Sequence, residues 1–400
     1  MQSIIKVFTD FALETGFAAF FTQPGAWKYA VMIVVACFLL YLAIVKKFEP
    51  LLLLPIAFGM LLTNLPGAGL YNADIFSGGH VNWQMLTQKG GLIDYLYLGV
   101  KLGIYPSLIF LGVGAMTDFG PLIANPKSLL LGAAAQLGIF VAYLGARLIF
   151  GFDDNLAASI GIIGAADGPT SILVSQVLHS NYIGPIAVAA YSYMALVPII
   201  QPFAIKLVTT KKERAMHMPY NPKHVSRSLR ICFPIMVTII AGFIAPMSVS
   251  LVGFLMFGNL LRECGCLERL SQTAQNDLAN LITLLLGITI SFSMQADQFV
   301  NLKTLIIMAL GLVAFVFDSI AGVMFAKLLN LFCKNKVNPM VGAAGISAFP
   351  MSARVIQKMG QEADCTNHLL MHAVGANVAG QIASVLAGGM ILNLVPQLMG

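Results

Sequence analysis

The chain has 400 residues, of which 58% are hydrophobic and only 10% are charged, with a formal net charge of +6. Soluble domains carry about 25% charged residues, so this composition excludes a soluble globular enzyme, a disordered chain and a nucleic-acid-binding protein. Long apolar runs recur from residue 29 to residue 397, without the alternation of apolar and polar residues that a transmembrane β-barrel shows. We therefore expect an all-α polytopic membrane protein.

Ten apolar segments predict membrane helices, and two further segments are apolar but interrupted. The interrupted segments, 157–177 and 339–357, contain Gly, Pro and polar residues. Because a hydrocarbon core of ~30 Å needs ~20 helical residues, the shortest segments must be tilted or extended at their ends. The ten continuous segments are about 29–45, 51–64, 97–116, 128–150, 184–208, 231–247, 249–262, 279–294, 303–331 and 366–397.

The basic residues predict the orientation in the membrane. The stretch 206–230 holds seven Lys and Arg residues against one acid, and the long polar loop 65–92 holds a single Lys. By the positive-inside rule the first is cytoplasmic and the second lies outside. These assignments agree only if each interrupted segment enters and leaves the membrane on the same side. Each half then crosses five times and the N-terminus is outside, with Arg147 the one clear exception.

The two halves are also related in sequence, which predicts an inverted repeat. Five residues of the first interrupted segment recur 181 positions later, and inverted repeats with broken midplane segments are typical of ion-coupled transporters. The alternative is a duplication retained only for packing. We predict a first repeat 1–208 with hairpin 157–177, a basic linker 209–230, and an inverted second repeat 231–400 with hairpin 339–357. The matching pairs are Gly164 and Gly345, Pro169 and Pro350, Ser171 and Ser352, Val174 and Val355, and Gln176 and Gln357.

Asp167 is the strongest functional candidate, because a charge within an apolar segment is costly and usually functional. Gly168 and Pro169 follow it and interrupt the helix, which frees backbone carbonyls. Thr170 and Ser171 add hydroxyl groups. A carboxylate, hydroxyls and free carbonyls form a hard oxygen site that suits a cation such as Na⁺. Asp before Gly-Pro is also a common helix cap, and both roles can hold together.

The second interrupted segment contains no acid and offers neutral oxygen ligands. Asn338, Gly342 and Ser347 are the candidates, and Arg354 is a candidate anion contact. Asn377 lies in the matching helix of the second half. The alternative for this segment is helix-breaking alone.

The remaining candidates are weaker. Asp118 follows a Gly-rich run and is either a cap or a gate, Asp297 is expected to be solvated, and Asp318 inside an apolar helix is a second-site candidate. His372 is either a satisfied core histidine or a proton relay. Tyr193 by itself reads as a packed core residue. We expect the six scattered cysteines to be free thiols, and no signal peptide to be removed.

Several motifs together resemble the β subunit of the sodium-pumping, biotin-dependent decarboxylases, which act on oxaloacetate, methylmalonyl-CoA, glutaconyl-CoA or malonate. The resemblance runs from about residue 29 to the C-terminus. It implies that Asp167 is the essential aspartate, and that Tyr193, Asn338, Gly342, Ser347, Arg354 and Asn377 occupy functional positions. The motifs are 112–121 (GVGAMTDFGP), 163–170 (IGAADGPT), 191–194 (YSYM), 350–354 (PMSAR) and 375–380 (GANVAG).

The resemblance implies a membrane subunit that decarboxylates carboxybiotin, consumes a proton and exports Na⁺. The expected partners are a biotin carrier and carboxyltransferase subunit, a small membrane-anchoring subunit and, in a homo-oligomer, further copies of this chain. The expected location is the bacterial cytoplasmic (inner) membrane.

As a hypothesis, Na⁺ neutralises Asp167 from the cytoplasmic side, and protons compete with it there. Arg354 steadies the carboxylate of carboxybiotin, and Tyr193 passes the proton. The alternative is a Na⁺-coupled or Na⁺/H⁺ secondary transporter without decarboxylase activity.

Overall fold

The structure is a computed structural model that describes residues 15–16, 18, 20, 26–47, 50–66, 70, 72, 74–76, 81–219, 225–333 and 336–399. Parts of the predicted outer loop 65–92 and of the predicted linker 209–230 lie outside these residues, as does the N-terminus up to residue 14. The secondary structure of the described residues is helical throughout, as predicted.

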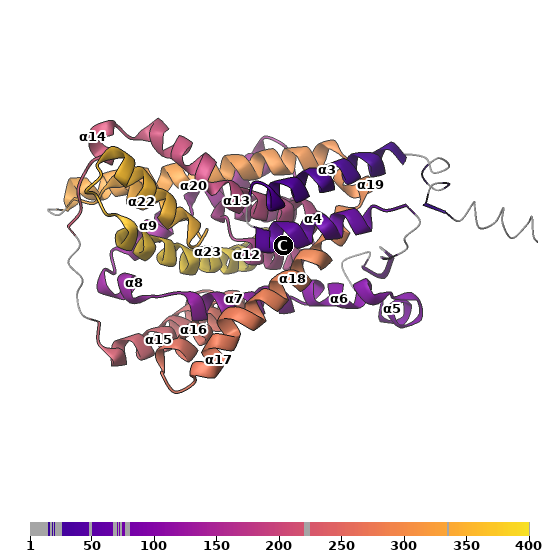
Figure 1. The fold of residues 1–400 in the computed structure, drawn as a ribbon, viewed down its shortest axis with the longest axis horizontal. Coiled ribbons are helices and arrows are strands. Elements are labelled where there is room, and N and C mark those ends of the chain that lie inside the picture. The colour runs from indigo at the N-terminus through magenta and orange to yellow at the C-terminus, as the bar shows by residue number, and fades with distance from the viewer. Residues whose placement is uncertain are drawn as a thin grey trace, which may run out of the picture. The chain divides into compact units, whose positions relative to one another are not determined.

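The chain divides into two compact units, and the first contains the described residues up to Tyr105, with Asn181–Pro185 and Ile282–Ile306. Its elements are α3 (Ala26–Ile44), α4 (Pro50–Thr63), α5 (Trp83–Lys89), α6 (Leu92–Lys101), η5 (Ser291–Met294) and α19 (Ala296–Phe299). Helices α3 and α4 pack side by side (Figure 1). At the end of α4, the amide of Asn64 donates to the carbonyls of Met60 and Met294, both at 2.9 Å, and so ties α4 to η5.

The second unit contains residues 106–180, 186–281 and 307–400 and holds all the broken segments discussed below. Four helices continue from one unit into the other along the chain: α7 (Ile104–Met116), α13 (Ile183–Val208), α18 (Ala279–Ile290) and α20 (Leu302–Phe332). The other elements of the second unit are α8 (Gly120–Ala124), α9 (Ser128–Ala134), α10 (Leu137–Leu148), α11 (Asp154–Gly161), η2 (Ile162–Ala165), α12 (Gly168–Val177), α14 (Lys211–Arg214), α15 (Arg227–Ile244), η3 (Pro246–Ser248), α16 (Val249–Glu263), α17 (Glu268–Thr273), the π-helical turn η4 (Ala274–Leu278), α21 (Pro339–Ala343), α22 (Met351–Ala363) and α23 (Leu370–Met399).

Five spans among the described residues are long and apolar enough to cross a membrane, and two bent helix pairs bring the number to seven if each pair is one span. This makes the protein a multi-pass membrane protein. The ten predicted apolar segments coincide with these spans and with the shorter apolar helices. The five spans are Ala26–Ile44, Ser128–Leu148, Arg227–Ile244, Leu302–Phe332 and Leu370–Gln397.

Helix α13 is bent by 71° between Met194 and Leu196. Pro198 lies within the helix and has no N–H group to donate to the carbonyl of Met194, one turn earlier. The bend is therefore encoded in the sequence.

The first interrupted segment forms two half-helices that meet at a left-handed residue. Helix α11 begins after its cap Asp153 and continues directly into η2. The residue after η2, Ala166, has a left-handed conformation with φ +52°. Asp167 then caps α12, and Pro169 occupies the first turn, where a missing N–H costs nothing. The predicted break is thus a sharp reversal of the chain at Ala166 and Asp167.

The second interrupted segment is built in the same order. Asn338 caps the short helix α21, residues 344–350 form a non-helical turn, and α22 follows from Met351. Both interrupted segments are therefore pairs of half-helices, as predicted.

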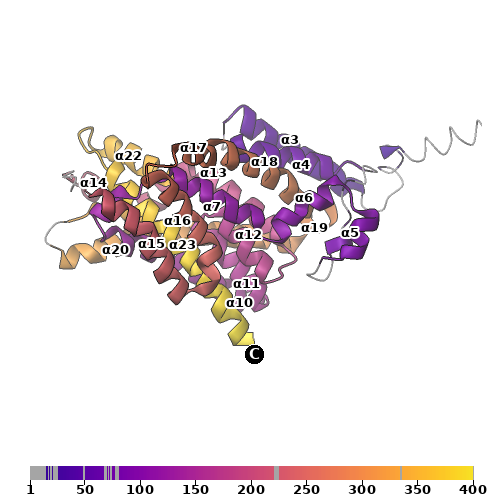
Figure 2. The same cartoon turned by 90° about the horizontal axis from the view of Figure 1, so that it is seen from below.

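Helix α23 packs against α8, α9, α12 and α22, and Figures 1 and 2 show it running through the second unit. Glycines permit its closest contacts. A Cβ on Gly380 would lie 2.1 Å from the carbonyl oxygen of Gly345, and a Cβ on Gly132 of α9 would lie 2.6 Å from the carbonyl carbon of Ala379. Small residues let membrane helices approach closely, and here they bring α23 against the turn of the second segment.

Candidate functional site

Asp167 is buried where the first interrupted segment reverses, with only 4% of the residue exposed. Its Oδ1 accepts a hydrogen bond of 3.3 Å from the amide of Thr170, so the carboxylate caps α12. Its Oδ2 accepts hydrogen bonds from the hydroxyls of Ser347, at 3.1 Å, and Ser384, at 2.8 Å. The carboxylate therefore joins both interrupted segments and α23.

The two interrupted segments also meet through their backbones. The amide of Ser347 donates to the carbonyl of Ala165 at 3.0 Å, next to the left-handed residue. Ser347 thus binds the first segment twice, once through its amide and once through its hydroxyl. This double contact fixes the turn of the second segment against Asp167.

Three buried amide side chains hold the turn of the second segment. Gln136, Gln201 and Asn377 donate hydrogen bonds of 2.7–3.2 Å to the carbonyl oxygens of residues 343–346. Gln136 also donates to the carbonyl of Gly132 at 3.1 Å, at the break between α9 and α10. These amides replace the hydrogen bonds that a continuous helix would have made.

Several buried oxygens near these breaks accept no hydrogen bond from the described residues. They include the side-chain oxygens of Gln136, Gln201, Asn377 and Gln381. The hydroxyl of Thr170 lies beside the carboxylate of Asp167, outside hydrogen-bond geometry. Buried polar atoms without partners are costly, and neutral oxygens are ligands that a hard cation accepts. Among the described residues, no group of three or more His, Cys, Asp and Glu side chains could hold a metal ion.

Tyr191 is the tyrosine that contacts the Asp167 turn. A Cβ on Gly168 would lie 2.0–2.6 Å from atoms of the Tyr191 ring, so the ring packs directly on the residue after Asp167. The predicted Tyr193 points elsewhere, and its hydroxyl donates to the carbonyl of Met308 in α20. Tyr191 has no hydroxyl partner in the described structure.

The other predicted residues of the second segment lie at its ends. The Asn338 oxygen accepts from the amide of Met340, and its amide group donates to the carbonyls of Arg214 and Met216 at 3.0 and 2.8 Å. Gly342 packs on α20, where its Cβ would lie 2.0 Å from the carbonyl oxygen of Gly322. These two residues anchor the segment in this structure. Arg354 is exposed on α22.

The weaker candidates do not reach Asp167 through any described hydrogen bond. Asp118 accepts a hydrogen bond of 2.8 Å from the amide of Gly120, in the turn before α8. Asp318 is fully buried in α20. His372 lies half-buried on α23, and the side chain of Asp297 lies outside the described structure. All described cysteines are free thiols, as predicted.

Ser384 and Gln381 were not predicted, although the sequence contains a signal for them. Asn377, Gln381 and Ser384 are spaced four and three residues apart, so they share one face of an otherwise apolar helix. A polar stripe on a membrane helix marks an interior or functional face. The stripe would have predicted Ser384 as a neighbour of the site.

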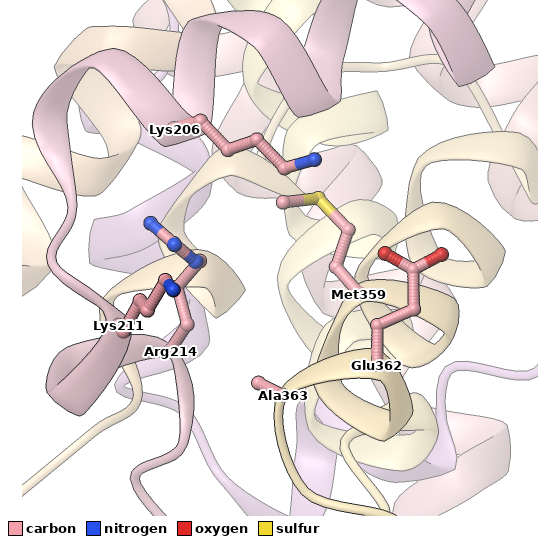
Figure 3. Close-up of a pocket in the computed structure, with 6 residues that line it drawn as sticks. All are labelled: Lys206, Lys211, Arg214, Met359, Glu362 and Ala363. Atoms are coloured by element: carbon pink, nitrogen blue, oxygen red, sulfur yellow. The ribbon is translucent and has the colours of Figure 1, made fainter.

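A basic pocket of about 320 Å³ lies between the end of α13, α14 and the end of α22 (Figure 3). Its cationic lining residues are Lys206, Lys211 and Arg214, against the single acid Glu362. The Arg214 guanidinium donates to the carbonyl and hydroxyl of Thr209 at 2.6 and 3.1 Å. The described structure contains no ion pair or hydrogen bond of the Lys206, Lys211 or Glu362 side chains, so the lysine charges are available to an anion.

Comparison with known proteins matches residues 28–395 to the family described as the Na⁺-transporting oxaloacetate decarboxylase beta subunit. The chain is 52% identical to the methylmalonyl-CoA decarboxylase subunit beta of Propionigenium modestum, over 98% of this chain and 100% of that one. It is 49% identical to the glutaconyl-CoA decarboxylase subunit beta of Acidaminococcus fermentans, over 99% of each chain. It is 44% identical to the probable oxaloacetate decarboxylase beta chain of Vibrio cholerae, over 99% of this chain and 100% of that one. The resemblance noted in the sequence is confirmed: the chain belongs to the family of Na⁺-transporting decarboxylase β subunits and is a membrane decarboxylase subunit that acts as a sodium pump.

Proposed function

We propose that Asp167 is the carboxylate that binds the transported Na⁺, with Ser347, Ser384, Thr170 and Asn377 as oxygen ligands. The observation that carries this proposal is that hydroxyls from two distant parts of the chain converge on one buried carboxylate oxygen. A bound cation neutralises Asp167 where water cannot, which offsets the cost of burying the charge.

In this proposal, Asn338 and Gly342 position the second interrupted segment. Their contacts with α14 and α20 hold the second segment so that Ser347 reaches Asp167. Tyr191, whose ring covers Gly168, takes the proton-passing role that the motif suggested for Tyr193.

We propose that the partner is a biotin carrier and carboxyltransferase subunit, within a complex that also contains a small membrane-anchoring subunit. Carboxybiotin on the carrier supplies a carboxyl group whose loss as CO₂ consumes one proton. Exporting one charge against ~100 mV costs ~2.3 kcal/mol, so Na⁺ movement needs such an exergonic reaction.

The basic pocket is the docking site that this function requires. It presents Lys206, Lys211 and Arg214 to an anion, and its volume lies at the lower end of small-molecule sites. The backbone of Arg214 also accepts the hydrogen bond from Asn338, which caps the segment that carries Ser347. Arg354 lies on α22, the helix that forms the other wall, and is a further anion contact in this proposal.

The proposed location is the bacterial inner membrane, with loop 206–230 cytoplasmic and the N-terminus outside. The two interrupted segments are proposed as hairpins of inverted repeats. Their shared order of cap, short helix, turn and second helix supports a common origin.

The test is reconstitution of the complex with its biotin-bearing partner in sealed vesicles. The wild-type complex should release CO₂ from the carboxylated carrier only with Na⁺, and should move Na⁺ in the same reaction. Asp167→Asn should abolish both activities. The matched control is Asp153→Asn, because Asp153 caps α11 as Asp167 caps α12, and Asn is an equally good cap.

Three outcomes decide between functions. Loss of both activities in Asp167→Asn, with the control unaffected, supports the proposal. Na⁺ movement without any dependence on biotin would instead favour a secondary transporter. Retained pumping by Asp167→Asn would exclude Asp167 as the site.

A further inference from the structure

Asp318, like Asp167, is a buried acid of the second unit; it lies in the interior of α20 and has no exposed surface. Neither carboxyl oxygen accepts a hydrogen bond from the described residues. The amides of Gly138 and Ile139, at the start of α10, face the group but fall short of hydrogen-bond geometry. Asp167, by contrast, accepts three hydrogen bonds. Three donors suit an ionised carboxylate, whereas a buried acid with none is the arrangement of a neutral carboxylic acid.

The packing around Asp318 leaves space for a proton rather than a metal ion. A Cβ on Gly138 would lie 2.4 Å from its Oδ1, and a Cβ on Gly164 of η2 would lie 2.7 Å from its Oδ2. Each oxygen therefore lies directly against a glycine. A hard cation needs several further oxygens at coordination distance, and those two glycines occupy that space.

The charged groups on the surrounding elements are engaged elsewhere. On α10, Arg147 pairs with Asp154 at 2.9 Å and Tyr143 donates to the same acid. On α20, Lys327 pairs with Glu213 at 2.8 Å, and Lys303 lies at the far end of the helix. The segment η2 contains no titratable residue. In this part of the described structure, no counter-charge compensates an ionised Asp318.

Asp318 and Asp167 contact the same short segment. Gly164 lies against Asp318 and precedes Asp167 by three residues. The Cα atoms of Gly164 and Asp167 are therefore at most ~11 Å apart. If the two carboxylates are ~12 Å apart, an effective dielectric constant of about 20 gives an interaction that changes the ligand affinity of each by about tenfold. Ionisation of both acids is therefore unfavourable unless a cation neutralises one of them.

We propose that Asp318 is a proton-binding site of the pump, protonated while Asp167 lacks Na⁺ and deprotonated more readily once Na⁺ is bound. The step is the loss of one proton from the neutral acid to give the carboxylate, and its return when Na⁺ leaves. This rests on the proposed Na⁺ site at Asp167. It would link the proton that decarboxylation consumes to the binding of Na⁺ at Asp167 through residues 162–167.

The first test uses the wild-type complex and dicyclohexylcarbodiimide, an apolar reagent that modifies protonated carboxyl groups in membrane proteins. Mass spectrometry of the labelled chain reports Asp167 and Asp318 separately. Labelling of Asp318 should fall several-fold with saturating Na⁺ but not with the same concentration of choline. Labelling that is absent or indifferent to Na⁺ would overturn the proposal.

The second test compares Asp318→Asn with Ser319→Ala in the purified complex, with Na⁺ binding followed by calorimetry in weakly buffered solution. Asn matches the neutral acid in shape, so the variant should fold, and Ser319 is the adjacent buried residue on the same helix. Asp318→Asn should bind Na⁺ about tenfold more weakly at high pH and release fewer protons per Na⁺ bound. Ser319→Ala should behave as wild type.

The two proposals fail in different ways. If Asp318→Asn binds Na⁺ and releases protons as wild type does, Asp318 is a neutral packing group and the coupling is excluded. If Asp167→Asn still binds Na⁺, the proposed site itself is wrong. If Asp318→Asn does not fold, the Na⁺ dependence of Asp318 labelling in the wild-type chain still tests the proposal.

Discussion

Ser384 donates a 2.8 Å hydrogen bond to Oδ2 of Asp167, although the two residues are 217 positions apart in the chain. The same oxygen accepts from Ser347, so α23 and the second interrupted segment converge on one atom. A hydroxyl that donates to a carboxylate still presents its lone pairs to a cation on its other side. Ser384 is therefore expected to contribute to Na⁺ binding although it lies outside the motifs.

Ser384→Ala should lower the affinity for Na⁺ while the fold is retained. A hydrogen bond to a charged group contributes about 1.5–3 kcal/mol, which corresponds to a loss of about tenfold or more in affinity. The concentration of Na⁺ for half-maximal decarboxylation measures this change. The control is Ser175→Ala, which removes a buried hydroxyl of α12 that has no partner in the described structure. Equal Na⁺ requirements of both variants would exclude Ser384 from the site.

Asn338→Asp should separate positioning from direct binding. The carboxylate keeps the cap on Met340 but cannot donate to the carbonyls of Arg214 and Met216. Loss of buried hydrogen bonds costs about 1–3 kcal/mol each, so thermal stability should fall markedly. Asn82→Asp is the control, because Asn82 caps α5 through its oxygen and is exposed. If Asn338 ligated Na⁺ itself, the added charge would instead raise Na⁺ affinity with little loss of stability.

The sequence predicts the interrupted segments because their cause is local. Gly168, Pro169 and the cap Asp167 define a helix start. The pattern repeated 181 residues later marks the second segment, in which the repeated residues Gly345 and Pro350 flank Ser347. Apolar length alone predicts the spans. The chain positions of both interrupted segments therefore follow from local residue types and their spacing.

The remaining features depend on contacts between distant residues, which local sequence does not encode. Ala135 and Gln136 interrupt the α9–α10 span without Gly or Pro, because the Gln136 side chain donates to carbonyls of both Gly132 and Gly345. The distinction between Tyr191 and Tyr193 depends on which ring meets Gly168. Such contacts arise from packing, and among them only Ser384 is indicated by its spacing on a helix.

Lys206→Gln combined with Lys211→Gln should weaken use of the carboxylated carrier. Removal of two cations from the pocket lowers the attraction for an anion, so the KM for the carrier should rise several-fold while the Na⁺ requirement is unchanged. Lys358→Gln is the control, since Lys358 is exposed on α22 and does not line the pocket. The difference in KM between the double variant and the control should become smaller at high salt, because salt screens the charges. A KM equal to that of the control would exclude this pocket as the docking site.

Glu213→Gln should lower stability at neutral pH but not in acid. Lys327 and the amide of Thr210 lower the pKa of Glu213 below its ordinary value of 4.5. A lowered pKa stabilises the fold above the ordinary value, and this contribution is lost as the pH falls through the lowered pKa. A partly exposed pair contributes about 0.2–1 kcal/mol. The deficit in unfolding temperature relative to wild type should be present at pH 7 and smaller at pH 4. A deficit in unfolding temperature that is independent of pH would show that Glu213 stabilises the fold by packing rather than by its charge.

Gly380→Ala should disrupt the fold around the site, whereas Gly145→Ala should not. A Cβ on Gly380 would lie 2.1 Å from the carbonyl oxygen of Gly345, and because the contacted atoms belong to the backbone, α23 must move away. That shift would also carry Ser384 from Asp167. At Gly145 in α10 a Cβ meets nothing within 4 Å, and Ala is the better helix former by about 1 kcal/mol. The yield of folded complex and its Na⁺ affinity should both fall for Gly380→Ala alone. If the two variants were equally stable but only Gly380→Ala lost Na⁺ affinity, the contact would matter for the geometry of the site rather than for folding.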